Sequence, residues 1–338
     1  MPKKEGEAFG RQVIDFYQQT VGASLRQSPF DGSSREAFTA WQRNGRRRLR
    51  RILGEMPQEK VDFELQREVV EETDRCVRER LVYRTRPGLQ ATAYLLTPKG
   101  IDLPVPAMLC LHGHGQEGKE ATVDPESIYR GFARRFAEEG CVVLCPDQIG
   151  SGERILPEDK VTYQVLIHGL NMLGHTLIGV RYWDLVRGLD LLESFPEVER
   201  RRIGVMGLSL GGEMTLMLSA LEKRVKAACV CGYLTSHLST FLDRPHCTCG
   251  HLRDLAREFE HVDLAALIAP RPLFVDSGSR DPSFPSRDAR ELVRDLRPVY
   301  KLFDKPRTHL GIEVHDGEHE ISGLKSIPWM LRRLREER

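Results

Sequence analysis

The sequence predicts an α/β fold with a mainly parallel sheet of about eight strands, covered by helices on both faces. The first sign is a series of short apolar runs, which are typical of strands buried on both faces. The second is that segments with helical apolar spacing alternate with these runs, as in a parallel sheet with helices packed on each side. The runs lie at residues 107–111, 141–145, 203–206, 227–231, 273–275 and 311–314.

A helical extension is expected before the sheet, over residues 1–70. Apolar residues recur there near helical spacing, among them Phe9, Val13, Trp41 and Leu49. The same part holds an arginine-rich run at residues 46–51. Because an acidic stretch follows and the net charge is only +1, we interpret this run as a solvated helix face and not a nucleic-acid site.

Residues 71–338 are predicted to form the main domain, and an antiparallel hairpin is expected at its start. Residues 77–83 and 91–96 are strand-like, and Pro87-Gly88 between them is a turn signal. Three later segments show the apolar stripe of a helix packed on a sheet. Their stripes include Ile128, Phe132 and Phe136; Tyr182, Val186 and Leu189; and Trp329, Leu331 and Leu334.

Two connections are too long for plain strand-to-helix loops. They span about residues 147–181, the first insertion, and 232–261, the second insertion. Long insertions in a compact domain commonly form lids or binding walls. Both leave from the carboxyl ends of predicted strands, where functional loops of such sheets gather.

The composition is that of an ordinary globular protein of 338 residues, 40% hydrophobic and 29% charged. No secretory signal or membrane span is visible, so we expect a cytoplasmic protein whose eight cysteines are reduced. Near-neutral charge argues against a nucleic-acid partner. Whether copies of the chain associate is left open.

The pentapeptide at residues 207–211, Gly-Leu-Ser-Leu-Gly, follows a predicted strand and precedes a predicted helix. A strand, G-x-S-x-G and a helix together are typical of a nucleophile elbow, in which a tight turn exposes the serine hydroxyl. Its flanking glycines leave room that a Cβ would fill. Ser209 is therefore the predicted nucleophile.

A serine nucleophile needs a histidine base, and the histidine needs a carboxylate to orient it. Asp281 lies on the loop after the strand at 273–275, and His319 follows a glycine turn after the last strand. We favour this pair. The alternatives are Asp276, at the strand end, and His315, expected to be still within its strand.

Two backbone N–H groups should bind the oxyanion of the tetrahedral intermediate. One is that of Leu210, directly after the nucleophile. The other is that of His114, in the sequence His112-Gly113-His114-Gly115 after the first parallel strand. We expect the His112 side chain to hold this loop by a hydrogen bond.

Two histidines and two cysteines crowd the second insertion, at His246, Cys247, Cys249 and His251. Such ligands suit zinc or copper. Structural zinc sites usually draw their ligands from separated segments, however, and here all four lie on one loop. We therefore expect lid-wall residues or a local thiol pair, with no metal ion and no cofactor.

From about residue 76 to its end, the chain resembles the α/β-hydrolase superfamily. Within it, the sequence is similar to dienelactone-hydrolase-like and acetyl xylan esterase-like hydrolases. The shared motifs are the elbow, residues 111–115, 147–153 and 269–272, and His319-Glu320.

The resemblance implies hydrolysis of a small-molecule carboxylic ester through an acyl-enzyme, with acetyl esters of sugars as candidate substrates. Dienelactone hydrolases proper carry cysteine where this chain has Ser209, which argues against a dienelactone substrate. Two alternatives stay open. One is a peptidase or amidase using the same triad, and the other is a non-catalytic binding protein on a hydrolase fold.

Overall fold

The structure, a computed structural model, describes residues 3–157, 161–243, 245–305 and 308–336. Within these residues nine strands form one sheet in the order β1-β2-β3-β5-β4-β6-β7-β8-β9. From β5 to β9 every pairing is parallel, and the pairings from β1 through β3 to β5 are antiparallel. The strands are β1 (Gln66–Glu72), β2 (Cys76–Arg86), β3 (Leu89–Pro98), β4 (Val105–Leu111), β5 (Val142–Pro146), β6 (Val198–Leu208), β7 (Val225–Cys231), β8 (Leu273–Gly278) and β9 (Leu310–His315).

The predicted fold class is confirmed, including the hairpin, which is formed by β2 and β3. Sequence patterning missed β1. This edge strand is mostly exposed and charged, so it lacks the apolar run used to find the others. Its pairing with β2 is supported by an ion pair between Arg67 and Glu79 at 2.6 Å.

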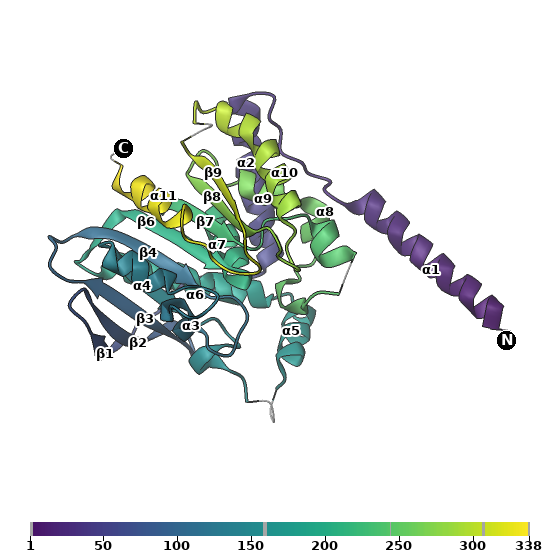
Figure 1. Ribbon diagram of the computed structural model, residues 1–338. Helices are drawn as coiled ribbons and strands as arrows, with labels where there is room; N and C mark the ends of the chain where they lie inside the picture. Colours follow the sequence, from purple (N-terminus) through teal and green to yellow (C-terminus); the bar gives the residue numbers. More distant parts are fainter. Residues whose placement is uncertain (1–2, 158–160, 244, 306–307, 337–338) are drawn as a thin grey trace.

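Helices cover both faces of the sheet (Figure 1). The longer ones are α1 (Lys3–Ser24), α2 (Arg35–Leu53), α5 (Tyr163–Met172), α6 (Leu177–Ser194), α7 (Leu210–Leu221), α10 (Ser286–Lys301) and α11 (Ser326–Arg335). The shorter ones are α3 (Lys119–Val123), α4 (Phe132–Glu138), α8 (Leu255–Glu258) and α9 (His261–Ala266), with single turns η1 (Gly152–Arg154), η2 (Leu238–Leu242) and η3 (Thr248–Gly250).

The central strand β4 shows how the two layers form. All seven of its residues are buried, because successive side chains point to opposite faces and both faces are covered. Leu109 packs in the core that includes α6 and α7. Met108 and Cys110 pack in the opposite core with Phe136 of α4 and Met330 of α11.

The two N-terminal helices differ in their packing. α2 is part of the core, where its Phe38, Leu49 and Leu53 are buried. α1 projects from the body (Figure 1), and its Phe16 side chain is 70% exposed. The sheet begins at Gln66. The domain boundary near residue 70 stays a prediction.

The arginine run is only partly the solvated face that we expected. Arg46 donates to the carbonyl oxygens of Ala220 (2.9 Å) and Leu267 (2.5 Å), and Arg50 donates to that of Leu221 at 3.5 Å. Ala220 and Leu221 end α7. The two guanidinium groups therefore complement the carbonyl end of the helix that follows Ser209.

Candidate active site

Ser209 lies in the turn between β6 and α7, with φ at +60° and ψ at −122°. Such a backbone is strained for a non-glycine residue and is held by its surroundings. A Cβ at Gly207 would lie 2.4 Å from the Gly211 carbonyl oxygen, and one at Gly211 would lie 2.2 Å from that of Leu111. The predicted steric need for both glycines is thus confirmed, and the elbow is tightly packed.

Asp281 and His319 meet at this end of the sheet. The His319 Nδ1 lies 2.7 Å from Asp281 Oδ2. The other carboxylate oxygen accepts the N–H groups of Ser283 and Phe284, at 2.8 and 2.9 Å, and the Asp281 side chain is fully buried. A carboxylate held in this way orients the imidazole with Nδ1 as donor and leaves Nε2 for another partner.

The His319 ring lies beside the elbow. It is so close to Gly232 that a Cβ there would lie 3.1 Å from the ring. The residue before Gly232, Cys231, accepts the Ser209 N–H at 3.0 Å. Phe284 stacks on His319 with ring centroids 5.3 Å apart, and it lines the same cavity as Ser209. The three predicted catalytic residues are therefore brought to one site.

The two alternatives, Asp276 and His315, pair with each other instead. His315 ends β9, as expected, and its Nε2 lies 3.3 Å from Asp276 Oδ1. The other Asp276 oxygen accepts the Ser326 hydroxyl at 2.8 Å. Burial raises the pKa of Asp276. This second pair joins β8, β9 and the start of α11.

The oxyanion loop, residues 112–115, packs directly against Ser209. A Cβ at Gly113 would lie 2.9 Å from the Ser209 Cβ, and the Gly113 N–H donates to the Tyr129 hydroxyl at 2.6 Å. The next amide along, that of His114, stays the predicted oxyanion donor together with that of Leu210.

His112 holds this loop, as predicted. Its Nε2 accepts the N–H of Gln148 at 2.9 Å, and burial lowers its pKa to about 4, so the ring is neutral. Behind it, the buried Lys119 ammonium contacts Asp147 at 2.7 Å and Glu153 at 2.6 Å. These contacts join the oxyanion loop to the first insertion.

The second insertion covers Ser209 closely. The cavity at the nucleophile, here called the Ser209 cavity, has a volume of only about 10 Å³. One wall is Glu213, four residues after the nucleophile, whose burial raises its pKa to about 8. The cavity is lined by His114, Ser209, Leu210, Glu213, Tyr233, Phe241, His246, Cys247, Cys249, Gly250 and Phe284.

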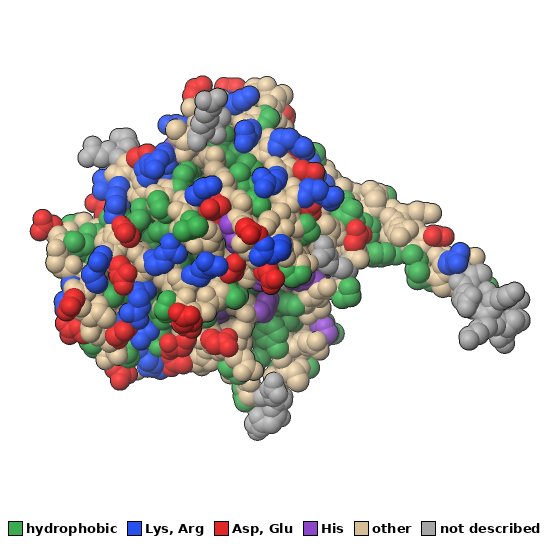
Figure 2. Space-filling view, in the orientation of Figure 1, with side chains coloured by type: hydrophobic (Ala, Val, Ile, Leu, Met, Phe, Trp, Pro, Cys, Tyr) green, Lys and Arg blue, Asp and Glu red, His purple; other side chains and the backbone are tan. Residues whose placement is uncertain are grey.

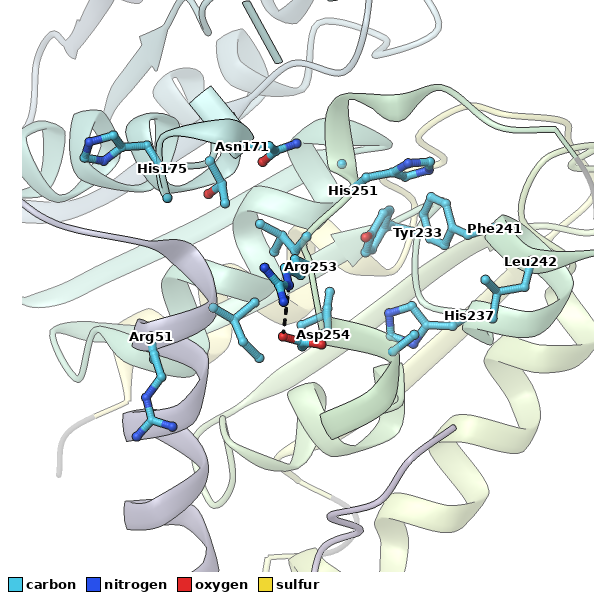
Figure 3. A pocket seen from close by; sticks show the side chains of 17 residues that line it. Arg51, Asn171, His175, Tyr233, His237, Phe241, Leu242, His251, Arg253 and Asp254 are labelled. Atoms are coloured by element: carbon cyan, nitrogen blue, oxygen red, sulfur yellow. Dashed lines mark ion pairs between the residues drawn. The ribbon is translucent and has the colours of Figure 1, made fainter. Parts of the chain in front are cut away.

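A second cavity of about 620 Å³, the large cavity, adjoins the first and shares Tyr233, Phe241 and Gly250 with it. Figure 3 shows Arg51 of α2 on one side and the residues of the second insertion on the other. Polar groups on its wall include Asn171, Thr176 and His175. This volume falls within the range of small-molecule sites.

The crowded His/Cys segment divides between the two cavities. Cys247 and Cys249 lie at the Ser209 cavity, where their sulfur atoms approach the His114 ring, and His251 lines the large cavity. A hydrogen bond from Cys249 holds the pKa of the Cys247 thiol well below its usual range. The sequence did not predict that His114 contacts Cys247 and Cys249. It also did not predict the places of Tyr129, Phe284 and Glu213 at the site, since no local pattern marks contacts between distant loops.

Comparisons with known proteins agree with this fold. Residues 28–307 match the model of the Abhydrolase family. YtaP of Bacillus subtilis strain 168, described only as a hydrolase, is 29% identical over 266 residues, which cover 75% of this chain and 86% of YtaP.

Two solved structures share the fold across nearly the whole chain. A Bacteroides fragilis protein named as an acetyl xylan esterase has a TM-score of 0.78 at 19% identity, covering 95% of this chain and 94% of its own. A glucuronoyl esterase from Solibacter usitatus has a TM-score of 0.67 at 16% identity, covering 93% and 97%.

Proposed function

Because the chain belongs to the Abhydrolase family, we propose that it is a carboxylic ester hydrolase working through an acyl-enzyme on Ser209. One observation carries the proposal. A serine with strained backbone on a strand-to-helix turn lies beside a histidine whose Nδ1 is held by a buried carboxylate. This combination supports nucleophilic acyl transfer.

In the proposed mechanism the Ser209 hydroxyl attacks the ester carbonyl carbon while His319 Nε2 takes its proton. Asp281 stabilises the resulting imidazolium. The N–H groups of Leu210 and His114 bind the oxyanion. His319 then gives the proton to the leaving alkoxide, which departs as the alcohol. Water, activated by the same histidine, releases the carboxylic acid and restores Ser209.

We propose a small acyl group, with acetyl as the first candidate. The Ser209 cavity is small and walled by Leu210 and by the rings of Tyr233 and Phe284, which favours a short acyl chain. The alcohol part of the substrate would occupy the large cavity, whose polar wall suits a hydroxylated group such as a sugar. Similar structures named as acetyl xylan and glucuronoyl esterases support a carbohydrate ester.

Substrate entry requires the second insertion to move. The Ser209 cavity has a volume of about 10 Å³, which is small for the reacting ester group. We propose that residues 236–243 and 245–254 act as a lid that opens before acylation, a gating step that many enzymes use.

The central test is Ser209→Ala, assayed on short p-nitrophenyl esters. We expect hydrolysis to fall by about 10³-fold or more, with unchanged circular dichroism, because the nucleophile alone is removed. Ser194→Ala, at an exposed serine that ends α6, is the matched control and should keep full activity. Undiminished hydrolysis by Ser209→Ala would overturn the proposal.

A substrate panel separates the alternatives. Acyl esters of increasing chain length, acetylated sugars and aminoacyl amides are compared by kcat/KM. We expect the highest value for acetyl esters. A preference for amides would favour the peptidase alternative, and failure of a fluorophosphonate to label Ser209 would favour a non-catalytic protein.

A further inference from the structure

The second insertion and the oxyanion loop meet at a cluster of three metal-ligating side chains. His114 Nε2 lies 3.6 Å from Cys247 Sγ and 2.7 Å from Cys249 Sγ. All three ligand atoms lie within 4.8 Å of one another. The proposed mechanism uses none of these three side chains, since His114 takes part only through its backbone N–H.

In the sequence, the four candidate soft ligands lie on one loop, which is unusual for structural zinc. In the structure, His114 joins two of them from a different strand end, 133 residues before Cys247. A C-x-C pair with a distant histidine is a ligand set from separated segments, as structural zinc sites usually have. His251, which the sequence grouped with the cysteines, lines the large cavity instead.

The geometry suits a tetrahedral ion. With Zn–S near 2.3 Å and Zn–N near 2.0–2.1 Å, the sulfur-to-nitrogen edge of a tetrahedron is about 3.6 Å. The Cys247–His114 distance of 3.6 Å already has this value, and Cys249 would have to withdraw by about 0.9 Å from its present 2.7 Å. The adjoining Ser209 cavity of about 10 Å³ has room for one water molecule as fourth ligand.

We propose that His114, Cys247 and Cys249 bind one Zn²⁺ ion, which fastens the second insertion over Ser209. Two thiolates and an imidazole form a ligand set that zinc takes in proteins. Both cysteines bind as thiolates, so a thiol that still carries its proton releases it on binding. The ion joins the oxyanion loop to the lid, so the occupied site holds the lid closed.

Direct metal binding tests the site, and this readout does not depend on the proposed function. Reduced, chelator-treated protein is titrated with Zn²⁺ and, separately, with Co²⁺. We expect one ion per chain and a thiolate-to-cobalt charge-transfer absorption. In Cys247→Ser, Cys249→Ser and His114→Gln, affinity should fall by more than about 100-fold, since even outer-shell changes cost 10–100-fold.

Two matched variants sharpen the result. His251→Gln and Cys76→Ser should keep one tight ion, because neither residue belongs to the cluster. Circular dichroism of the metal-free variants shows which of them are folded. No tight ion in reduced wild-type protein, or loss of the ion in His251→Gln but not in His114→Gln, would overturn the proposal.

The proposal that bound Zn²⁺ holds the lid closed is tested by the rate at which a fluorophosphonate labels Ser209. Zn²⁺ should slow labelling of wild-type protein by about tenfold or more, because the bound ion would hold Cys247 and Cys249 over the small Ser209 cavity. The same addition should leave the rate in Cys249→Ser unchanged. One tight ion without any slowing would keep the metal site and refute the fastening. Failure of labelling with and without zinc would instead count against the proposed function.

Discussion

At the scale of single residues, the site contains two Asp–His pairs that sequence position alone barely separates. Asp281 and Asp276 lie five residues apart, and His319 and His315 lie four apart. The structure gives them different partners. Asp281 receives two backbone N–H groups at 2.8 and 2.9 Å, whereas Asp276 receives a serine hydroxyl from α11 and the more distant N–H of Gly323 at 3.4 Å.

Asparagine variants of the two aspartates should therefore fail in different ways. Asp281→Asn should lower kcat on a p-nitrophenyl ester by up to about 10⁴-fold, because the amide no longer enforces the imidazole tautomer. Asp276→Asn should keep most of its kcat and lose about 1–3 kcal/mol of unfolding free energy, because a buried hydrogen-bonded group is mismatched. Kinetics and thermal unfolding of both variants decide between them.

The reverse pattern, with kcat lost in Asp276→Asn and kept in Asp281→Asn, would show that the triad uses the other aspartate. Loss of activity in both variants with intact folding would mean that the two pairs act together.

The meeting of Ser209, Asp281 and His319 at one end of the sheet could be predicted, because candidate triad residues occur in a set order at strand ends. Their catalytic roles stay a prediction. The side chains that surround these three residues could not be predicted from the sequence. Phe284 stacking on His319, and the Cys249 sulfur against His114, depend on how loops from different strands fold over one another. No spacing along the chain encodes that.

At the scale of elements, the second insertion is fastened to the body by a capped helix. Glu260 caps α9, and its Oε1 accepts the N–H groups of His237 and His261 at 2.7 and 2.8 Å. The His261 ring is fully buried, and its Nδ1 accepts the Thr235 N–H at 3.3 Å. The lid thus lies between residues that are anchored to the body, Thr235 on one side and His261 on the other.

Acid should loosen this anchor through His261. Burial, reinforced by the charge of His237, lowers its pKa to about 3. The unfolded chain binds this proton near pH 6.5, so the stability contribution is complete above that pH and is lost as the pH falls toward 3. Between pH 6.5 and 4.5 the loss from this group is about 2 kcal/mol.

Urea unfolding of His261→Asn across the same range measures this effect. The asparagine oxygen can accept the Thr235 N–H, so the variant should fold and show a shallower pH dependence than wild type. His168→Asn changes an exposed histidine on α5 and should keep the wild-type dependence. If the free energy of unfolding depends on pH in the same way in wild type and His261→Asn, His261 is not the source of the acid sensitivity.

Elements buried on both sides were the easiest to predict, since burial imposes an unbroken apolar run. Among the elements that the sequence did not predict are β1 and the short turns η1, η2 and η3. β1 is an exposed edge strand, and the turns are single helical turns too short to show an apolar period.

At the scale of the whole molecule, opposite charges nearly balance, with a net charge of +1. Figure 2 shows Lys and Arg side chains interspersed with Asp and Glu over the face in view. Among the described residues no helix is long and apolar enough to cross a bilayer.

The two N-terminal helices relate differently to this body, and a matched pair of phenylalanine variants should show it. Phe38 of α2 is fully buried beside Trp41 and Phe303, with ring centroids 5.7 and 5.9 Å away. Phe38→Ala should therefore cost about 3–5 kcal/mol of unfolding free energy. Phe16 of α1 is 70% exposed, so Phe16→Ala should change it by less than about 0.5 kcal/mol.

Urea unfolding at two protein concentrations tests this contrast, together with deletion of residues 1–23. Among the described contacts, the deletion removes a hydrogen bond from Tyr17 to the Leu242 carbonyl. The deletion should lower the free energy of unfolding by about 1 kcal/mol or less, since an exposed hydrogen bond contributes little. If Phe16→Ala or the deletion is strongly destabilising, and more so at high concentration, the apolar side of α1 is covered by a second copy of the chain. α1 would then belong to the folded unit through association, as α2 does through packing on α7.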